Sequence, residues 1–120
     1  MGKDKRIAII GLGYVGLPLA IAFAEKYSVI GYDINEKRIK ELQHQLDNTK
    51  EIESYQFVTK QPLLFTSSLN DIRGANVFII TVPTPIIQNK QPDLHFLLDA
   101  SQSVGSVLKK SDIVIYESTV

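Results

Sequence analysis

The sequence predicts an α/β fold in which a parallel sheet is covered by helices on both faces. Short apolar runs alternate along the chain with segments of helical periodicity, as expected for consecutive βαβ units. The first apolar run stops at the pattern G-x-G-x-x-G, formed by Gly11, Gly13 and Gly16, and an alanine-rich apolar segment follows. A strand before this pattern and a helix after it are the context that a dinucleotide site requires.

Composition narrows the class of protein further. The chain has 120 residues, 44% of them hydrophobic and 22% charged, with a formal net charge of zero and a pI near 6.7, so nothing suggests a nucleic-acid surface. Cysteine is absent from the sequence, which excludes a disulfide, a thiolate metal site or a cysteine nucleophile within these residues. No apolar run approaches the roughly 20 residues needed to span a bilayer. These features predict a cytoplasmic protein without nucleic-acid or membrane partners.

The first half of the chain predicts two βα units. We expect strands over 6–10 and 28–33 and helices over 14–26 and 36–46. The first strand is a continuous β-branched run, typical of a strand buried on both faces, and Lys26 suits the last turn of the first helix. Asn35 is the expected N-cap of the second helix, in which Ile39, Leu42 and Leu46 form one apolar stripe.

The second half predicts the remaining elements. We expect a polar loop over 47–60 that could include a short helical turn, and strands over 63–66, 76–81 and 112–116. A turn of helix capped by Ser67 or Ser68 should run to Arg73, with Gly74 as its stop signal. Between the last two strands we expect a helix over 94–109, capped by Asp93. Gly105 lies inside that helix and suggests close packing on the sheet.

The order of elements predicts a Rossmann-type, doubly wound sheet with strand order 3-2-1-4-5, and residues 1–120 form one dinucleotide-binding domain. Ligands bind beyond the carboxyl ends of the strands in such a sheet. The unusual residues of the chain follow those ends: the glycines, Asp33, the segment 82–85 and the segment 117–119. Their clustering predicts one site.

The glycines and Asp33 predict the cofactor. Gly11 permits the tight turn, Gly13 lets a diphosphate approach the backbone, and Gly16 lets the helix pack closely. Asp33 follows Gly16 by 17 residues and would accept hydrogen bonds from the adenosine ribose, which favours NAD over NADP. A tight turn whose anion site is unused remains the alternative.

Two cations near Asp33 leave the cofactor question open. Lys37 or Arg38 could accept a 2′-phosphate, and Arg38 could also reach the adenine or ribose, or belong to a solvated helix face.

The remaining candidate residues say less about function. The Val82–Pro85 segment could border the cofactor or simply be a stiff loop, and Ser118 and Thr119 could approach its reacting end or cap a helix. His44 and His95 have no carboxylate or second histidine at ligand spacing, so we expect no metal site.

Several motifs together resemble one family. They are Ile7–Pro18 with the glycine pattern, Gly31-Tyr32-Asp33, Val82-Pro83-Thr84-Pro85, Pro92-Asp93-Leu94 and Tyr116–Val120. The chain resembles the N-terminal domain of the UDP-glucose/GDP-mannose dehydrogenase family from about Lys5 onward. The proline segment and the Glu-Ser-Thr-Val end are similar to the branch of Vi-polysaccharide-type UDP-N-acetylglucosamine/galactosamine 6-dehydrogenases.

The resemblance implies a reaction and a set of residues. Such enzymes serve surface polysaccharide biosynthesis and oxidise the C6 alcohol of a UDP-sugar to a carboxylate with two NAD⁺, while a cysteine captures the aldehyde. By position, the diphosphate would lie on Gly11, Gly13, Tyr14, Val15 and Gly16. The adenosine end would lie on Asp33 and Arg38. Val82, Thr84 and Pro85 would border the cofactor, and Ser118 and Thr119 would lie near its nicotinamide, Thr119 in a supporting catalytic role.

The chain also departs from this family. Members are much longer, dimerise through later segments, and carry the nucleophilic cysteine and most sugar contacts there. We therefore expect a fragment that binds NAD⁺ without turnover; NADH production from a UDP-sugar by this chain alone would contradict this. The alternatives are another Rossmann dehydrogenase, of hydroxy or amino acids, and a non-catalytic NAD-sensing module.

Overall fold

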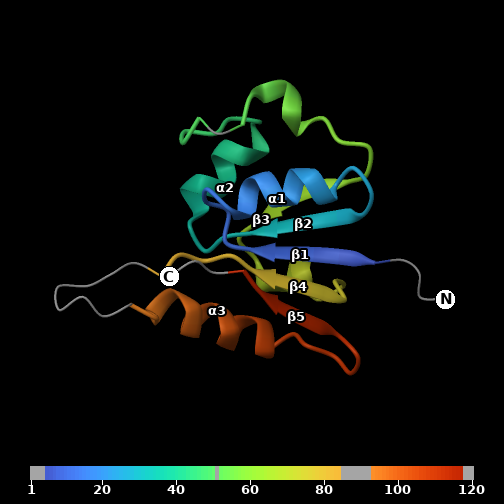
Figure 1. The fold of residues 1–120 in the computed structure, drawn as a ribbon, viewed down its shortest axis with the longest axis vertical. Helices are drawn as coiled ribbons and strands as arrows, with labels where there is room; N and C mark the ends of the chain where they lie inside the picture. The colour runs from blue at the N-terminus through green and yellow to red at the C-terminus, as the bar shows by residue number, and fades with distance from the viewer. Residues whose placement is uncertain (1–4, 51, 85–92, 118–120) are drawn as a thin grey trace.

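The computed structural model describes residues 5–50, 52–84 and 93–117, which form a five-stranded parallel sheet between two helical layers (Figure 1). The strands are β1 (Arg6–Ile10), β2 (Ser28–Tyr32), β3 (Leu63–Thr66), β4 (Val77–Ile80) and β5 (Ile113–Tyr116). Their order is β3-β2-β1-β4-β5, so the predicted fold class and strand order are confirmed.

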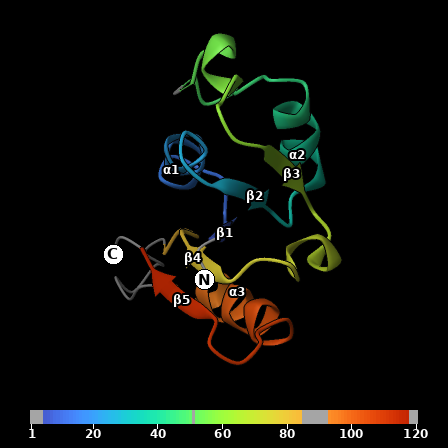
Figure 2. The same ribbon diagram turned by 90° about the vertical axis from the view of Figure 1, so that its right-hand side faces the viewer.

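The helices occupy both faces of the sheet (Figures 1 and 2). They are α1 (Gly16–Phe23), α2 (Glu36–Gln43) and α3 (His95–Gly105), with 3-10 turns η1 (Ser54–Phe57) and η2 (Leu69–Ile72). Side chains of β1 alternate between two cores: Ile7 and Ile9 pack with α1, α2 and η1, whereas Ala8 and Ile10 pack with α3 and η2. This alternation follows from the two-residue period of a strand and places the central strands in the core on both faces.

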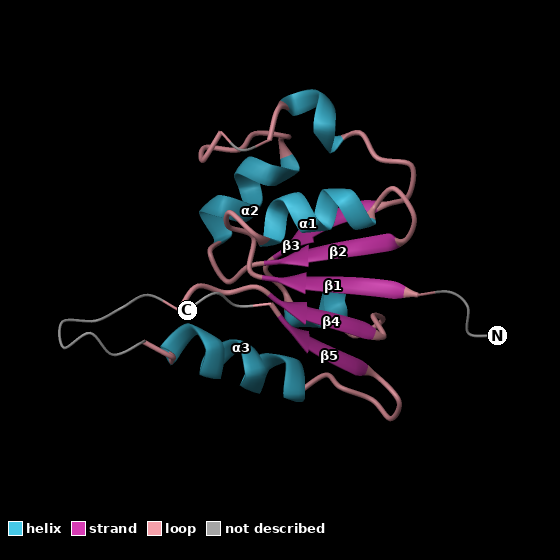
Figure 3. Ribbon diagram, viewed as in Figure 1, coloured by secondary structure: helices cyan, strands magenta, loops and turns pink. Residues whose placement is uncertain are grey.

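The register aligns the carboxyl ends of the strands. Ile10 pairs with Tyr32 of β2 and with Ile80 of β4, and the outer strands continue the same level at Thr66 and Tyr116. The segments that follow β1, β2 and β4 therefore leave the sheet side by side at one edge, as Figure 3 shows.

The helices are shorter than the periodicity predicts. After Phe23, i→i+3 bonds tighten the chain into turns, so Lys26 lies beyond α1. At the end of α2, Gln45 adopts a left-handed φ of 61° and the Leu46 N–H bonds back to the Glu41 carbonyl, which is a helix-terminating geometry. Leu46 is consequently 58% exposed and does not belong to the apolar stripe.

The capping predictions fare differently. Asn35 caps α2 as predicted, accepting a hydrogen bond from the Arg38 N–H. Asp93 accepts from the His95 N–H, although α3 begins at His95. The expectation for Gly105 is wrong: it is the last residue of α3, and a Cβ there would meet nothing within 4 Å.

Candidate functional site

The glycine turn after β1 is tightly built. Gly11 has a φ of +100°, which strongly favours glycine, and its N–H donates to the Tyr32 carbonyl at 2.8 Å. The Thr81 hydroxyl oxygen lies 2.6 Å from the Gly11 carbonyl oxygen and 3.1 Å from that of Ile10. A Cβ on Gly16 would collide with the Gly11 carbonyl, so Gly16 lets α1 approach the turn as the sequence predicts.

The turn presents unpaired donors before α1. Among the described residues, the N–H groups of Gly13, Tyr14 and Val15 have no hydrogen-bond acceptor. Gly13 faces open space, since a Cβ there would meet nothing within 4 Å. Free N–H groups and the positive end of a helix dipole favour an anion. The start of α1 is therefore chemically suited to a diphosphate.

Asp33 links the second strand to this turn. Its Oδ2 accepts a hydrogen bond from the Leu12 N–H and its Oδ1 one from the Asn35 N–H, both at 2.9 Å. Each carboxylate oxygen can accept further hydrogen bonds. Burial and, secondly, the charge of Asp33 raise the pKa of the neighbouring Tyr32 phenol above its ordinary value of 10.0.

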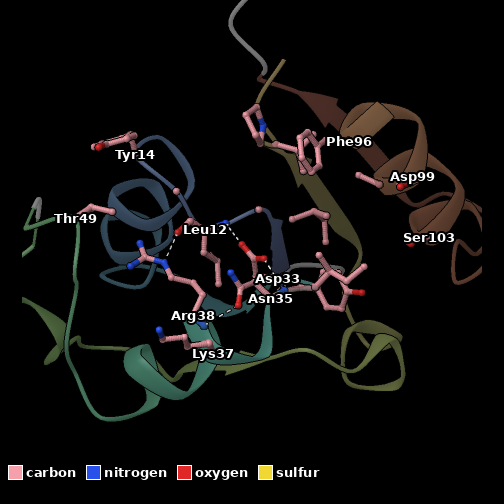
Figure 4. Close-up of a pocket in the computed structure, with 18 of the residues that line it drawn as sticks. Leu12, Tyr14, Asp33, Asn35, Lys37, Arg38, Thr49, Phe96, Asp99 and Ser103 are labelled. Atoms are coloured by element: carbon pink, nitrogen blue, oxygen red, sulfur yellow. Dashed lines mark hydrogen bonds between the residues drawn. The ribbon is translucent and has the colours of Figure 1, made fainter. Parts of the chain in front are cut away.

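Arg38 is not a residue of a solvated helix face. It is 8% exposed; its Nε donates to the Leu12 carbonyl and its Nη1 to Asp47 Oδ1, both at 2.8 Å. Nη2 is buried and has no partner among the described residues. Figure 4 shows Arg38 and Asp33 both reaching toward Leu12. The solvated alternative is thus wrong.

Asp47 holds the other end of Arg38. Burial raises the pKa of the Asp47 carboxyl, but hydrogen bonds from Thr49 and Arg38, together with the Arg38 charge, outweigh burial and hold that pKa at about 2, below the ordinary 3.8. Because its side chain is fully shielded from solvent, the carboxylate is stable there only with these donors.

This lowered pKa predicts acid sensitivity. Between about pH 2 and pH 3.8 the unfolded chain binds more protons at Asp47 than the folded chain does. The stabilisation is therefore complete above pH 3.8 and is lost as the pH falls toward 2. We expect Asp47→Asn to flatten the fall in the free energy of unfolding over this interval, measured by urea denaturation at stepped pH. Equal pH dependence in the two proteins would contradict the assignment.

These groups line one cleft of about 760 Å³ across the carboxyl ends of β1, β2 and β4. In Figure 4, Tyr14, Thr49 and Arg38 lie on one side of the cleft and Phe96 and Asp99 of α3 on the other. Of the predicted site residues, the structure brings together on the cleft Gly11, Gly13, Tyr14, Asp33, Arg38 and Val82. Val15, Gly16 and Thr84 do not line it. Pro85, Ser118 and Thr119 lie outside the described residues.

The sequence analysis did not predict that α3 contributes to the cleft. His95, Phe96, Asp99 and Ser103 line the cleft, and His95 Nε2 lies 3.1 Å from Asp99 Oδ2. The expectation that no carboxylate accompanies His95 is therefore wrong, although the i,i+4 spacing on a helix could have revealed the pair. Asn48 and Thr49 also line the cleft from a segment predicted only as a polar loop.

The described residues contain no group of three or more histidine, cysteine, aspartate or glutamate side chains that could hold a metal ion. Among them there is also no helix with the length and apolar character to cross a membrane.

The fold and the turn geometry define the chain as a Rossmann-type domain of the dinucleotide-binding class. The chain belongs to the UDP-glucose/GDP-mannose dehydrogenase family: the family model described as its NAD binding domain matches residues 5–120. The predicted family resemblance is thereby confirmed, and with it NAD as the cofactor of the class.

Similar proteins cover the chain almost completely. It is 55% identical over 118 residues to a UDP-N-acetyl-D-glucosamine 6-dehydrogenase of Pseudomonas aeruginosa and 52% identical over 117 residues to one of Salmonella typhi; each match covers 98% of this chain and 28% of the relative. The structure of a UDP-D-ManNAc dehydrogenase from Pyrococcus horikoshii matches with a TM-score of 0.82 and 39% identity, over 96% of this chain and 28% of that one. The chain thus spans little more than a quarter of these relatives.

Proposed function

We propose that the chain is the oxidant-binding part of a UDP-N-acetylhexosamine 6-dehydrogenase and binds NAD⁺ in the cleft at the carboxyl edge of the sheet. The observation that carries the proposal is the row of unpaired N–H groups at Gly13 and Tyr14, which line the cleft, and at Val15, which follows them. All three residues are exposed, and a Cβ on Gly13 would meet nothing within 4 Å. The identity to UDP-N-acetyl-D-glucosamine 6-dehydrogenases supports the substrate class.

Each proposed ligand has a physical role. The three N–H groups bind the diphosphate, while Gly11 and Gly16 shape the turn that presents them. The remaining oxygen lone pairs of Asp33 accept hydrogen bonds from the adenosine ribose hydroxyls, and a 2′-phosphate would meet their negative charge, which favours NAD over NADP.

Other assignments concern the edges of the cofactor. Arg38 offers its unpaired Nη2 to the adenosine end. Val82 borders the cofactor where the chain leaves β4. Thr84 and Pro85 are assigned to the same border from the sequence alone. Ser118 and Thr119 are assigned from the sequence alone, near the nicotinamide.

The reaction is a four-electron oxidation. NAD⁺, when bound, would accept a hydride from the sugar. Two hydride transfers, to two NAD⁺, and the addition of one water convert the C6 alcohol to a carboxylate. The residues of this chain bind and orient the oxidant. We propose that the groups that hold and attack the sugar lie in a region of the whole protein that corresponds to the part of the relatives not covered by this chain. Two NADH per UDP-sugar is the expected yield of the whole protein, whereas one would indicate a simple alcohol dehydrogenase.

That the whole protein is cytoplasmic and forms a homodimer stays a prediction.

Gly13 provides the direct test of the site. We expect Gly13→Ala to weaken NAD⁺ binding by about tenfold or more, which is at least ~1.4 kcal/mol, because its methyl group occupies the space of the diphosphate. Its folding should change little, since a Cβ there meets no protein atom within 4 Å. Isothermal titration with NAD⁺ and the thermal unfolding midpoint measure the two effects.

Gly105→Ala is the matched control. Gly105 is also free of contacts within 4 Å but ends α3 and does not line the cleft, so its variant should bind NAD⁺ like the unmodified chain. Unchanged affinity of Gly13→Ala, or no NAD⁺ binding by the unmodified chain, would overturn the proposal.

A further inference from the structure

Asp47 is the centre of a buried hydrogen-bond network beside the cleft. Its Oδ1 accepts from Arg38 Nη1 at 2.8 Å, from the Thr49 hydroxyl at 2.7 Å and from the Thr49 N–H at 3.0 Å. Its Oδ2 accepts from the Ile52 N–H at 3.0 Å. The Asp47 side chain has no exposed surface, although it belongs to a connecting segment rather than to a helix or strand. Donors on several sides fix this carboxylate in one place.

The network continues from Arg38 into the glycine turn. Arg38 Nε donates to the Leu12 carbonyl at 2.8 Å, and the Leu12 N–H donates to Asp33 at 2.9 Å. Two of the three guanidinium nitrogens are therefore held from different directions: Nε by Leu12, and Nη1 by Asp47 with a longer hydrogen bond to Asn48 Oδ1 at 3.3 Å. Glu41 Oε1 lies 3.8 Å from the same Nη1. A guanidinium is planar, so two fixed nitrogens determine the position of the third.

That third nitrogen is the unusual feature. Nη2 is buried and has no hydrogen-bond partner among the described residues, although an unpaired buried donor costs free energy. Arg38 lines the cleft together with Asn48 and Thr49, which hydrogen-bond to Arg38 and to Asp47, respectively. Glu41 also lines it, and its Oε1 is likewise buried without a hydrogen-bond partner among the described residues. A purely structural arginine would be expected to satisfy all three nitrogens. An unpaired donor on a side chain that lines the cleft instead suits an acceptor atom of a ligand.

We propose that Asp47 is a positioning residue that holds the Arg38 guanidinium so that Nη2 faces the adenosine end of the dinucleotide. This inference rests on the proposed function and adds to it a residue that does not touch the cofactor. Asparagine at this position keeps the shape, but its single oxygen cannot accept from both Arg38 and Ile52, and the side chain carries no negative charge. The contact that holds Nη1 then loses its charge, and the network around it loses a hydrogen bond.

The test compares ligands that contain or lack adenosine. We expect Asp47→Asn to weaken binding of ADP-ribose by about 10- to 20-fold, the lower end of the loss of one charge-assisted hydrogen bond, while the affinity for nicotinamide mononucleotide stays within about twofold. Isothermal titration at pH 7 measures both dissociation constants. If Asp47→Asn does not fold, Asp47→Glu keeps the charge on a side chain one methylene longer, and we expect the same selectivity with a smaller factor.

Asp112→Asn is the matched control. The Asp112 side chain is 5% exposed and its Oδ2 accepts from the Lys109 N–H at 2.8 Å and from Lys109 Nζ at 3.2 Å, but the residue does not line the cleft. Its variant loses a comparable connection and should bind ADP-ribose normally. Equal weakening in the two asparagine variants would reduce Asp47 to a structural role and overturn the inference.

A double variant tests whether Asp47 acts through Arg38. Arg38→Lys keeps the charge but lacks Nη2, so we expect Asp47→Asn to weaken ADP-ribose binding no further in its background. Additive losses would overturn the inference while leaving the proposed function intact. Failure of the unmodified chain to bind ADP-ribose or NAD⁺ would overturn both.

Discussion

Gly16→Ala is expected to destabilise the chain by about 3 kcal/mol or more, at the upper end of the cost of overpacking a core. The added Cβ would collide with the Gly11 carbonyl oxygen and lie 2.5 Å from Thr81 Oγ1. Both neighbours are fixed, because Thr81 donates to that carbonyl and Gly11 donates to β2. The helix start must therefore move away from the sheet.

Thermal unfolding followed by circular dichroism measures this loss. For a domain of this size, 3 kcal/mol corresponds to a fall in the unfolding midpoint of about 10 °C or more. Gly13→Ala is the internal comparison, since it adds the same methyl group three residues earlier, where nothing lies within 4 Å. A Gly16→Ala protein as stable as Gly13→Ala would contradict the packing described for the turn.

Arg38→Met is expected to cost about 3–5 kcal/mol, as for the loss of one partner of a buried ion pair. The variant keeps most of the aliphatic packing but leaves the shielded Asp47 carboxylate without its cation and the Leu12 carbonyl without its donor. Urea denaturation at pH 7 measures the effect. Adding Asp47→Asn should recover part of the loss, because the second change removes the uncompensated charge.

Arg73→Met is the control for this prediction. Arg73 is exposed and its Nε donates to Asn70 within the same short segment, so its replacement should change the free energy of unfolding by no more than about 0.5 kcal/mol. If Arg38→Met were equally mild, the buried network would contribute nothing to stability.

The elements of the fold were predictable because their signals are local. The β-branched run before Gly11, the glycine spacing and the apolar strand over 77–80 each depend on neighbouring residues, and strand order follows from the handedness of βαβ units. Helix ends were less predictable. Gln45 ends α2 in a left-handed conformation, which is usually signalled by a glycine, and Leu46 consequently faces solvent.

The site was predictable at the glycines and Asp33 but not in its surroundings. The burial of Arg38 depends on Asp47, which reaches it from a connecting segment without periodicity. Such a contact is set by the path of the loop in three dimensions, and residue types alone do not determine that path. The contribution of α3 to the cleft was not predictable for a different reason. His95 and Asp99 are spaced i,i+4, and this spacing is common on helix surfaces whether or not the residues have a function.

The hydrogen bonds of the Leu12 backbone affect the thermodynamics of ligand binding. Both of its backbone polar groups are engaged by the second βα unit, its N–H by Asp33 and its carbonyl by Arg38, while the Gly11 carbonyl is engaged by Thr81. The diphosphate end and the adenosine end of the cleft thus form one preorganised body. Its conformational entropy is lost during folding, so little of the ordering cost is left for a ligand to offset when it binds.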